Sequence, residues 1–355
     1  MLNRRFWFGL AVSLLFLGLL LWRLDLRAIG RSLQEAHYVY VIPSIAIYFV
    51  AVWFRTLRWH VLLLPLGPIS LARLFPVVVV GYAANNLLPM RLGEVVRSYY
   101  VGQREGMSKS AALATIALER VFDGLTLLFF LAAVSVFLPV TGLIEGLARD
   151  TGVPVPLLIA GTAGPFVLVL ALFLVIAHRP WWVLRRLAAF TRKLPGGTGA
   201  RVNELGELFV TGLGVLRHMR RLIALAILCI PVWLGEAAMY YVIALAFDLP
   251  SMLGGVETMA AIILAVTATS NLATALPSSS GGIGPFEFFA AATLVVLGAP
   301  AETAAAYAVA LHVTLLVPVT LLGLFYLWVG KESLAQLVRM GRRDVATAGR
   351  SEDTP

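Results

Sequence analysis

Long apolar stretches alternate with short polar segments along the whole chain. A helix that crosses a bilayer needs about 20 apolar residues. Six stretches come close to this length or exceed it, and each is predicted to form a transmembrane helix: 6–22, 40–54, 111–138, 156–177, 222–247 and 303–329. The pattern predicts an all-α polytopic membrane protein with about six full transmembrane helices.

Two further apolar stretches, 74–101 and 259–297, are each interrupted near the middle by polar residues. The first interruption contains Pro89 and Gly93, and the second contains Pro277, several glycines and a glutamate. Proline removes a backbone donor and disfavours helix at the preceding residue. Each stretch is therefore predicted to form a re-entrant helical hairpin. Irregular backbone persists at membrane depth only where it is buried in protein or lines a wet cavity, so we expect the function in such a cavity.

The two hairpins share a spacing that indicates an internal repeat. Glu94 precedes Arg120 by 26 positions, and Glu287 precedes His312 by 25. The predicted repeats cover about 40–138 and about 222–330. With the N-terminus in the cytoplasm, the first hairpin would enter from the cytoplasmic side and the second from outside. Inverted repeats of this kind are typical of secondary transporters.

The composition agrees with a membrane protein and leaves no room for a large soluble enzyme domain. Of the 355 residues, 60% are hydrophobic and 13% are charged, and the mean hydropathy is +0.88. Soluble domains are nearer one quarter charged. We expect a single transmembrane domain over residues 1–335 and a largely disordered cytoplasmic tail over 336–355. Cys229 is the single cysteine, so no intrachain disulfide is possible.

The formal charge of +9 is concentrated in segments that the topology places in the cytoplasm. The most basic segment is 178–221, in which 181–193 and 202–216 are predicted to be amphipathic surface helices. Basic residues favour cytoplasmic loops and anionic headgroups, so we expect no nucleic-acid partner. The exceptions are Arg23, Arg27 and Arg31, which this topology places outside. The second span ends in a basic and aromatic sequence that is typical of the cytoplasmic face, with Arg55, Arg58 and Trp59.

Three charged residues, Glu119, Arg120 and Asp123, lie near the middle of the third long span. A charge that faces lipid costs about 2.5–3.5 kcal/mol on an insertion scale, so these side chains must pair or face a polar cavity. Arg120 and Asp123 can meet on one helix face. Glu119 and Asp123 need a positive partner between them, and we expect Arg91 or Arg97 of the hairpin. The group either pins the hairpin to the bundle or binds a ligand, and the two roles are compatible.

The second hairpin offers weaker candidates. Glu287 either caps the hairpin backbone or contributes to a site, and His312 is either a core histidine bonded to a neighbour or a proton relay. The glycine pattern here is not a dinucleotide fingerprint, because no strand or soluble βαβ unit surrounds it. The histidines are scattered, and no metal-ligand spacing, phosphate-binding loop or nucleophile motif is present. We therefore expect no cofactor, no metal and no enzyme activity of the chain's own.

Three motifs together resemble the transmembrane flippase-like domain of the lysylphosphatidylglycerol synthase family. They are Asn86-Leu-Leu-Pro89-Met-Arg91-Leu-Gly93-Glu94-Val-Val-Arg97, then Ala117-Leu-Glu119-Arg120-Val-Phe-Asp123, then Pro277-Ser-Ser-Ser-Gly281-Gly282-Ile-Gly284-Pro285-Phe-Glu287. The resemblance covers about residues 5–330. In two-part members this domain moves an aminoacylated phospholipid between leaflets, and a separate soluble domain makes that lipid from aminoacyl-tRNA. The resemblance implies a stand-alone translocation domain that is not a synthase. It departs at His312, where an arginine is expected, so strict charge symmetry between the repeats is not expected.

The sequence thus predicts a lipid translocator of the bacterial inner membrane with both termini in the cytoplasm. Its substrate would be an anionic or modified phospholipid or a polyprenyl-phosphate-linked lipid. In this hypothesis Arg91, Arg97 and Arg120 hold the phosphate, because arginine binds phosphate through strong, directional hydrogen bonds. Glu94, Glu119 and Asp123 position those arginines. The other candidate substrate-binding residues are Asn86, Pro277, Ser279, Gly282, Gly284, Glu287 and His312.

Two alternatives from other classes remain open. One is an integral membrane transferase that acts on a lipid-linked substrate, with Glu94 as its carboxylate. The other is a non-transporting partner that holds a separate lipid-modifying enzyme or glycosyltransferase. The expected partners in every case are membrane lipids with anionic headgroups.

Overall fold

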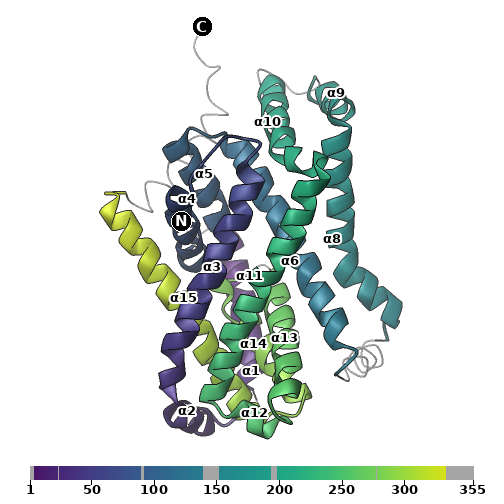
Figure 1. Ribbon diagram of the computed structural model, residues 1–355. Helices are drawn as coiled ribbons and strands as arrows, with labels where there is room; N and C mark the ends of the chain where they lie inside the picture. The colour runs from purple at the N-terminus through teal and green to yellow at the C-terminus, as the bar shows by residue number, and fades with distance from the viewer. Residues whose placement is uncertain are drawn as a thin grey trace.

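A computed structural model describes residues 4–22, 24–88, 92–138, 152–192, 198–276 and 278–332. The described residues form helices and no strands (Figure 1). The α-helices are α1 (Arg4–Leu21), α2 (Leu26–Glu35), α3 (Val41–Leu63), α4 (Leu71–Leu87), α5 (Leu92–Glu105), α6 (Lys109–Val134), α8 (Val155–His178), α9 (Pro180–Thr191), α10 (Thr198–Gly212), α11 (Met219–Ala246), α12 (Leu249–Met252), α13 (Val256–Ala273), α14 (Pro285–Val296) and α15 (Ala301–Val329). Short 3-10 turns cover Tyr38–Tyr40 (η1), Leu213–Arg217 (η3) and Ser280–Gly282 (η4).

The lengths and apolar compositions of the helices are those of a multi-pass membrane protein. Four described segments are long and apolar enough to cross a membrane unaided, Tyr38–Leu63, Met219–Ala246, Val256–Ala273 and Ala301–Val329, and the number rises to six if two bent helix pairs each form one span. Apolar side chains such as Leu168 and Phe129 are 71% and 65% exposed. Exposed apolar surface on this scale is suited to lipid contact. α6 has spanning length, but three charges lie at its centre.

The two interrupted apolar stretches form helix–turn–helix pairs, α4 with α5 and α13 with α14. α4 ends at Leu87, and Leu88 is already extended (φ −105°, ψ 140°), as expected of a residue before proline. α14 begins with Pro285 at its first turn, a position where proline costs no hydrogen bond. The turn between α13 and α14 contains Gly281, Gly282 and Gly284 at φ of 72°, 81° and 101°. Only glycine adopts such angles without strain.

The hairpins approach each other from opposite ends of the bundle (Figure 1). The base of the first lies beside the end of α15, where Arg104 contacts Glu332 at 3.6 Å. The base of the second lies beside α12, where the Gly255 amide donates to the Pro250 carbonyl at 2.8 Å. Their turns meet between the two ends, because Ser280 Oγ donates to the Leu87 carbonyl at 3.3 Å.

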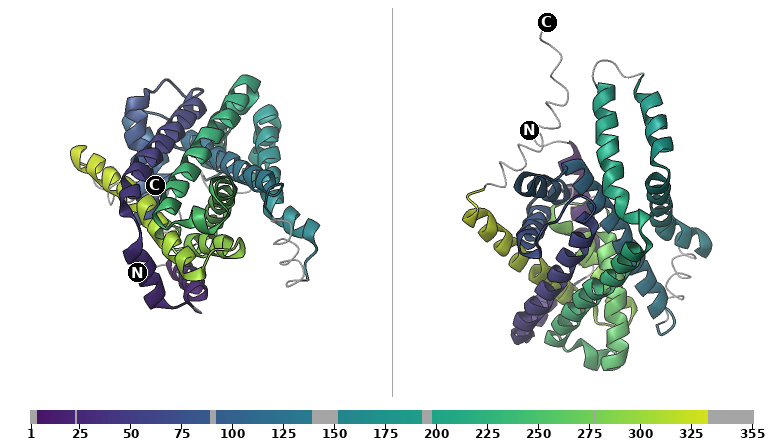
Figure 2. Two further views of the ribbon diagram at one scale, coloured as in Figure 1. Left: turned by 60° about the horizontal axis from the view of Figure 1, so that its bottom comes forward. Right: turned by 45° about the horizontal axis from the view of Figure 1, so that its top comes forward.

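The amphipathic segments form α9 and α10, close to their predicted positions. Together with α8 they stand on one side of the bundle in every view (Figures 1 and 2). α9 and α10 lie at the end of the molecule opposite α2 and α12 (Figure 1). The segment that follows the first span contains α2.

One boundary prediction is wrong. The second span does not end near Phe54, because α3 continues to Leu63. Arg58 and Trp59 are 1% and 0% exposed, so they do not form a cytoplasmic boundary. The physical reason is that carboxylates from α6 neutralise Arg58 inside the bundle.

Close packing of α4 on α5 depends on two glycines. A Cβ at Gly93 would collide with the Gly81 carbonyl oxygen, and a Cβ at Gly81 would lie 2.9 Å from the Cβ of Arg97. Gly93→Ala is expected to lower the free energy of unfolding by about 1–3 kcal/mol, the usual cost of overpacking. Thermal unfolding in detergent measures this change. Gly18→Ala is the matched control, because no atom lies within 4 Å of the added Cβ. Equal stability of the two variants would contradict the close packing.

Candidate functional site: a polar cavity between the two hairpins

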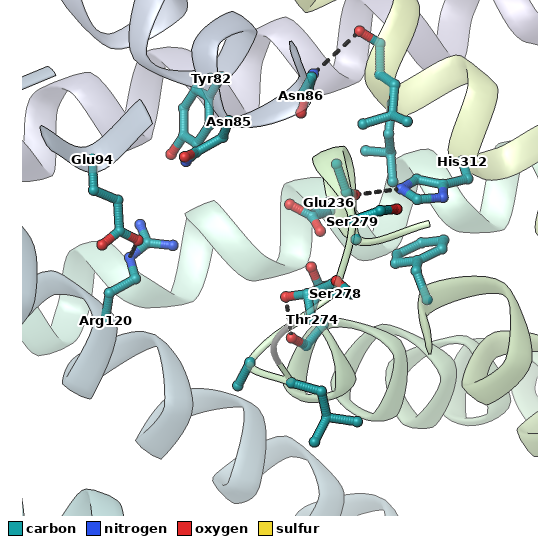
Figure 3. A pocket seen from close by; sticks show the side chains of 18 of the residues that line it. Tyr82, Asn85, Asn86, Glu94, Arg120, Glu236, Thr274, Ser278, Ser279 and His312 are labelled. Carbon is teal, nitrogen blue, oxygen red and sulfur yellow. Dashed lines mark hydrogen bonds and ion pairs between the residues drawn. The ribbon is translucent and has the colours of Figure 1, made fainter. Parts of the chain in front are cut away.

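A cavity of about 330 Å³ lies where the hairpin turns meet (Figure 3). Its wall combines side chains from both hairpins with side chains from α3, α6, α11 and α15. Most of them carry a charge, an amide or a hydroxyl. The lining residues are Tyr48, Arg55, Tyr82, Asn85, Asn86, Glu94, Arg120, Glu236, Asn271, Thr274, Ala275, Leu276, Ser278, Ser279, Gly281, Gly282, Phe286, His312, Leu315 and Leu316.

Behind one wall of the cavity lies a buried ion-pair network centred on Arg58. Its guanidinium reaches Glu119 at 2.8 Å and Asp123 at 2.6 Å. Trp233 Nε1 donates to the same Asp123 oxygen at 3.0 Å. Arg58 is thus the positive group expected between the two carboxylates of α6. The prediction that Arg91 or Arg97 takes this place is wrong for Arg97, which contacts only Glu119 of the pair. Arg91 lies outside the described residues.

Arg97 ties the first hairpin to α6. Its Nη1 lies 3.0 Å from Glu119, and its guanidinium carbon lies 3.7 Å from the centroid of the Trp59 ring. It is 4% exposed and does not line the cavity. This contact is the pinning role expected for the charges of α6.

Arg120 is the member of the network that faces the cavity. Its Nη2 lies 3.1 Å from Asp123, which confirms the predicted pairing on one helix face, and 3.3 Å from Glu119. Its Nε lies 3.8 Å from Glu94, a loose contact between side chains that are 28% and 24% exposed. Figure 3 shows Arg120 and Glu94 directed toward each other on one side of the cavity. This pair can exchange its mutual contact for a ligand.

A second ion pair, Arg55 with Glu236, stands beside the first network. Glu236 also accepts from Tyr240 at 3.1 Å, and that hydroxyl accepts from Asn271 Nδ2 at 3.0 Å. In these described networks the charges balance, with four arginines (Arg55, Arg58, Arg97 and Arg120) against four carboxylates (Glu94, Glu119, Asp123 and Glu236). Such balance is needed because uncompensated buried charges are expensive.

His312 lines the opposite side of the cavity, and Glu287 supports it from behind. His312 Nδ1 lies 2.6 Å from Glu287 Oε1, and His312 Nε2 lies 3.1 Å from the Gly281 carbonyl oxygen. The other Glu287 oxygen accepts from the Gly284 amide at 2.7 Å, which confirms the predicted capping role. The imidazole stacks on Phe286 at 4.1 Å between ring centroids.

The predicted site residues separate into three groups. Those that line the cavity are Asn86, Glu94, Arg120, Ser279, Gly282 and His312. Those that support the wall from behind are Arg97, Glu119, Asp123 and Glu287, while Gly284 packs against the backbone of Ser13. Arg91 and Pro277 lie outside the described residues, as do 139–151, 193–197 and the tail from 333.

Sequence reasoning missed Arg55, Arg58 and Glu236. Glu236 had a usable signal, because it is a single carboxylate in the middle of a long apolar span, where a charge indicates a partner or a function. In the described part of the chain no group of three or more His, Cys, Asp or Glu side chains is arranged to hold a metal ion.

Comparisons with known proteins agree with this architecture. The model of the lysylphosphatidylglycerol synthase TM region matches residues 6–323. A UPF0104 membrane protein of Methanothermobacter thermautotrophicus is 26% identical over 337 residues, which are 91% of this chain and 92% of that protein. Glycosyltransferase AglD of Haloferax volcanii is 27% identical over 322 residues, which are 85% of this chain and 50% of AglD. No solved structure matches the chain. Because the family model matches most of the chain, the protein belongs to the family of the lysylphosphatidylglycerol synthase transmembrane region.

Proposed function

We propose that the protein moves a lipid headgroup between the two leaflets through the cavity between the hairpins. The observation that carries this proposal is the cavity itself, a space lined by charged and hydrogen-bonding side chains from long apolar helices and from both hairpins. A headgroup in transit needs polar partners at membrane depth, while its acyl or polyprenyl chains stay in lipid. Buried ionisable groups in a membrane protein mark such pathways more often than they mark inert structure.

The arrangement of the hairpins supports alternating access. We propose that both are re-entrant and that they belong to inverted repeats, since they approach from opposite ends and meet at Ser280 and Leu87. Rocking of one repeat against the other would expose the cavity to each leaflet in turn.

Arg120 is the residue that we propose binds the headgroup phosphate. Of the arginines in the α6 network it is the one that lines the cavity, and its contact with Glu94 is the loosest in that network at 3.8 Å. Glu94 would then be free to accept from a hydroxyl or amine of the headgroup. Glu119 and Asp123 hold the guanidinium from behind. A modified glycerophospholipid and a polyprenyl-phosphate-linked sugar both carry a phosphate of this kind.

The basic end of the molecule suggests its orientation. We propose that α9 and α10 face the cytoplasm, together with both termini, in the inner (plasma) membrane of a bacterium. The tryptophans and arginines of α9 stack in pairs, Trp181 with Arg185 and Trp182 with Arg186. Such pairs suit a surface of anionic headgroups, which are the expected partners. These side chains support the proposed orientation of α9 and α10. They do not bear on the bacterial assignment, and the named relatives are archaeal.

Leaflet exchange in proteoliposomes tests the proposal. Fluorescent phosphatidylglycerol, its aminoacylated form and a polyprenyl-phosphate sugar would be placed in both leaflets, and the outer leaflet would then be quenched chemically. We expect quenching beyond the outer-leaflet share for at least one phosphate-bearing lipid, compared with protein-free vesicles. Folded, inserted protein that exchanges none of them would overturn the proposal.

A second candidate function is glycosyl transfer to a lipid, because AglD is named a glycosyltransferase and the chain matches half of its length. In that case Glu94 would act as a base at the cavity. Incubation of the protein with lipid-linked donors and acceptors, followed by mass spectrometry, separates the two functions. A covalently changed lipid would favour transfer, and leaflet exchange without any new lipid would favour translocation. A further possibility is that the protein works beside a separate lipid-modifying enzyme.

A further inference from the structure

His312 stands apart from the other ionisable side chains of the cavity, because both of its ring nitrogens face acceptors. Nδ1 lies 2.6 Å from the Glu287 carboxyl, and Nε2 lies 3.1 Å from the Gly281 carbonyl oxygen. A neutral imidazole has one donor and one acceptor nitrogen. The second Glu287 oxygen already accepts from the Gly284 amide. These contacts therefore require one proton more than a neutral histidine and an ionised glutamate contain.

Two placements of that extra proton satisfy all the contacts. In one, the imidazolium donates from both nitrogens to an ionised Glu287. In the other, protonated Glu287 donates to Nδ1, while Nε2–H donates to Gly281. Both placements make the pair electrically neutral, as a site that is 4% and 6% exposed inside a membrane protein requires. Loss of the proton leaves a buried negative charge and removes one of the two hydrogen bonds.

The contacts of His312 hold the turn that closes the cavity. Gly281 belongs to η4, and Ser280 of the same turn donates to the Leu87 carbonyl at the tip of the first hairpin. On the far side of the junction, Asn86 Nδ2 donates to Thr320 Oγ1 of α15 at 2.9 Å. Because Gly281 and Gly282 have positive φ angles, the turn is not a regular helix, and its position depends on contacts with neighbouring elements. His312 thus links α15 to the point where the hairpins meet.

We propose that His312 and Glu287 form a proton-binding site that latches the hairpin junction and makes the proton the coupling ion of transport. The coupling rests on the proposed function, while the latch stands on the geometry alone. The proton holds the turn of the second hairpin against the first. Its release into the cavity, which His312 lines, frees the turn and opens the junction.

No other charged group of the cavity makes a described hydrogen bond or ion pair with the His312 ring. α14 contributes Glu287, the partner. The remaining ionisable groups of the cavity wall come from α3, α4, α5, α6 and α11. Arg55 contacts Glu236 and Tyr82, and Arg120 contacts Glu94. Tyr48 is the other ionisable residue of the wall. α2 also packs on α15, but it contributes no residue to the cavity.

Cysteine labelling measures the latch directly. Ser280→Cys in a Cys229→Ser background provides a single thiol at the turn. The rate at which this thiol reacts with a maleimide is divided by the rate for Glu204→Cys on α10, in the same background. The ratio removes the effect of pH on thiol reactivity itself. As the pH is raised stepwise, the ratio is expected to rise about two- to tenfold when the proton is lost, the scale of one hydrogen bond. His312→Gln and Glu287→Gln are expected to abolish this rise, and His178→Gln, outside the cavity, is expected to retain it.

An imposed pH gradient in the lipid-exchange vesicles measures the coupling. Wild-type protein is expected to accumulate the lipid in one leaflet under the gradient, and His312→Gln is expected to exchange it without accumulation. A labelling ratio that does not change with pH in the otherwise unsubstituted protein would overturn the latch. Lipid exchange that is the same with and without the pH gradient would overturn the coupling and leave the proposed function intact. Labelling that titrates without exchange of any lipid would support the latch and overturn the proposed function.

Discussion

Replacing Arg58 by alanine is expected to lower the free energy of unfolding by about 3–5 kcal/mol, the cost of breaking a buried ion pair from one side. The side chain is 1% exposed and contacts Glu119 and Asp123 at 2.8 and 2.6 Å. Without it, Arg97 and Arg120 remain near Glu119, and Asp123 keeps Arg120 and Trp233. The network then contains one more negative than positive charge. Thermal unfolding in detergent and the yield of monodisperse protein measure the loss.

Arg73→Ala is the matched control for this prediction. Arg73 also joins two elements through an ion pair, Glu105 at 3.4 Å, but its side chain is 72% exposed. Exposed ion pairs contribute about 0–1 kcal/mol, so little change is expected. Combining Arg58→Met with Asp123→Asn restores the charge balance and is expected to recover part of the stability. An Arg58→Ala protein as stable as Arg73→Ala would show that the network does not hold the bundle together.

Replacing Arg120 by alanine is expected to slow leaflet exchange about tenfold to a hundredfold while the protein remains folded. The fold tolerates the loss because Glu119 keeps Arg58 and Arg97, Asp123 keeps Arg58, and the carboxylate left without a partner is Glu94, whose side chain is 24% exposed. The rate of leaflet exchange is expected to fall, because a hydrogen bond to a charged group contributes about 1.5–3 kcal/mol. A change of about 1.36 kcal/mol corresponds to tenfold in rate. Exchange rate and thermal stability, measured on the same preparation, test both halves of the prediction.

Arg120→Lys and Glu94→Gln sharpen the result. Lysine preserves the charge but not the paired donors of the guanidinium, so partial exchange is expected. Glu94→Gln removes the loose partner of Arg120 without removing Arg120 itself, and a changed preference among headgroups is expected. Exchange by folded Arg120→Ala protein at the wild-type rate would exclude Arg120 as the phosphate ligand.

The hairpins could be predicted because their signals are local. Proline and glycine interrupt an apolar run whatever surrounds it, and Glu287 reaches its capping partner Gly284 only three residues away. The Arg120–Asp123 pair is likewise set by helix geometry. These features follow from spacing along the chain, which a sequence contains in full.

The centre of the network could not be predicted, because it depends on which helices become neighbours. Arg58 lies 61 and 65 positions before its partners, and a basic and aromatic sequence after an apolar run is as common at a membrane surface as inside a bundle. Only the packing of α3 beside α6 and α11 decides between these environments. Arg55 and Glu236 are 181 positions apart. The sequence could show that Glu236 is a charge within an apolar span, but it could not show that Arg55 is its partner.

The most direct test of the account is to lock the junction between the hairpins. Leu87→Cys and Ser280→Cys in the Cys229→Ser background place two thiols at residues already joined by a hydrogen bond, and a short thiol-reactive cross-linker joins them reversibly. The account predicts that cross-linked protein stops exchanging lipid in proteoliposomes and that reduction restores exchange, while the cross-linker does not change the exchange rate of either single-cysteine variant. Undiminished exchange by fully cross-linked protein would show that lipid headgroups do not pass between the hairpins.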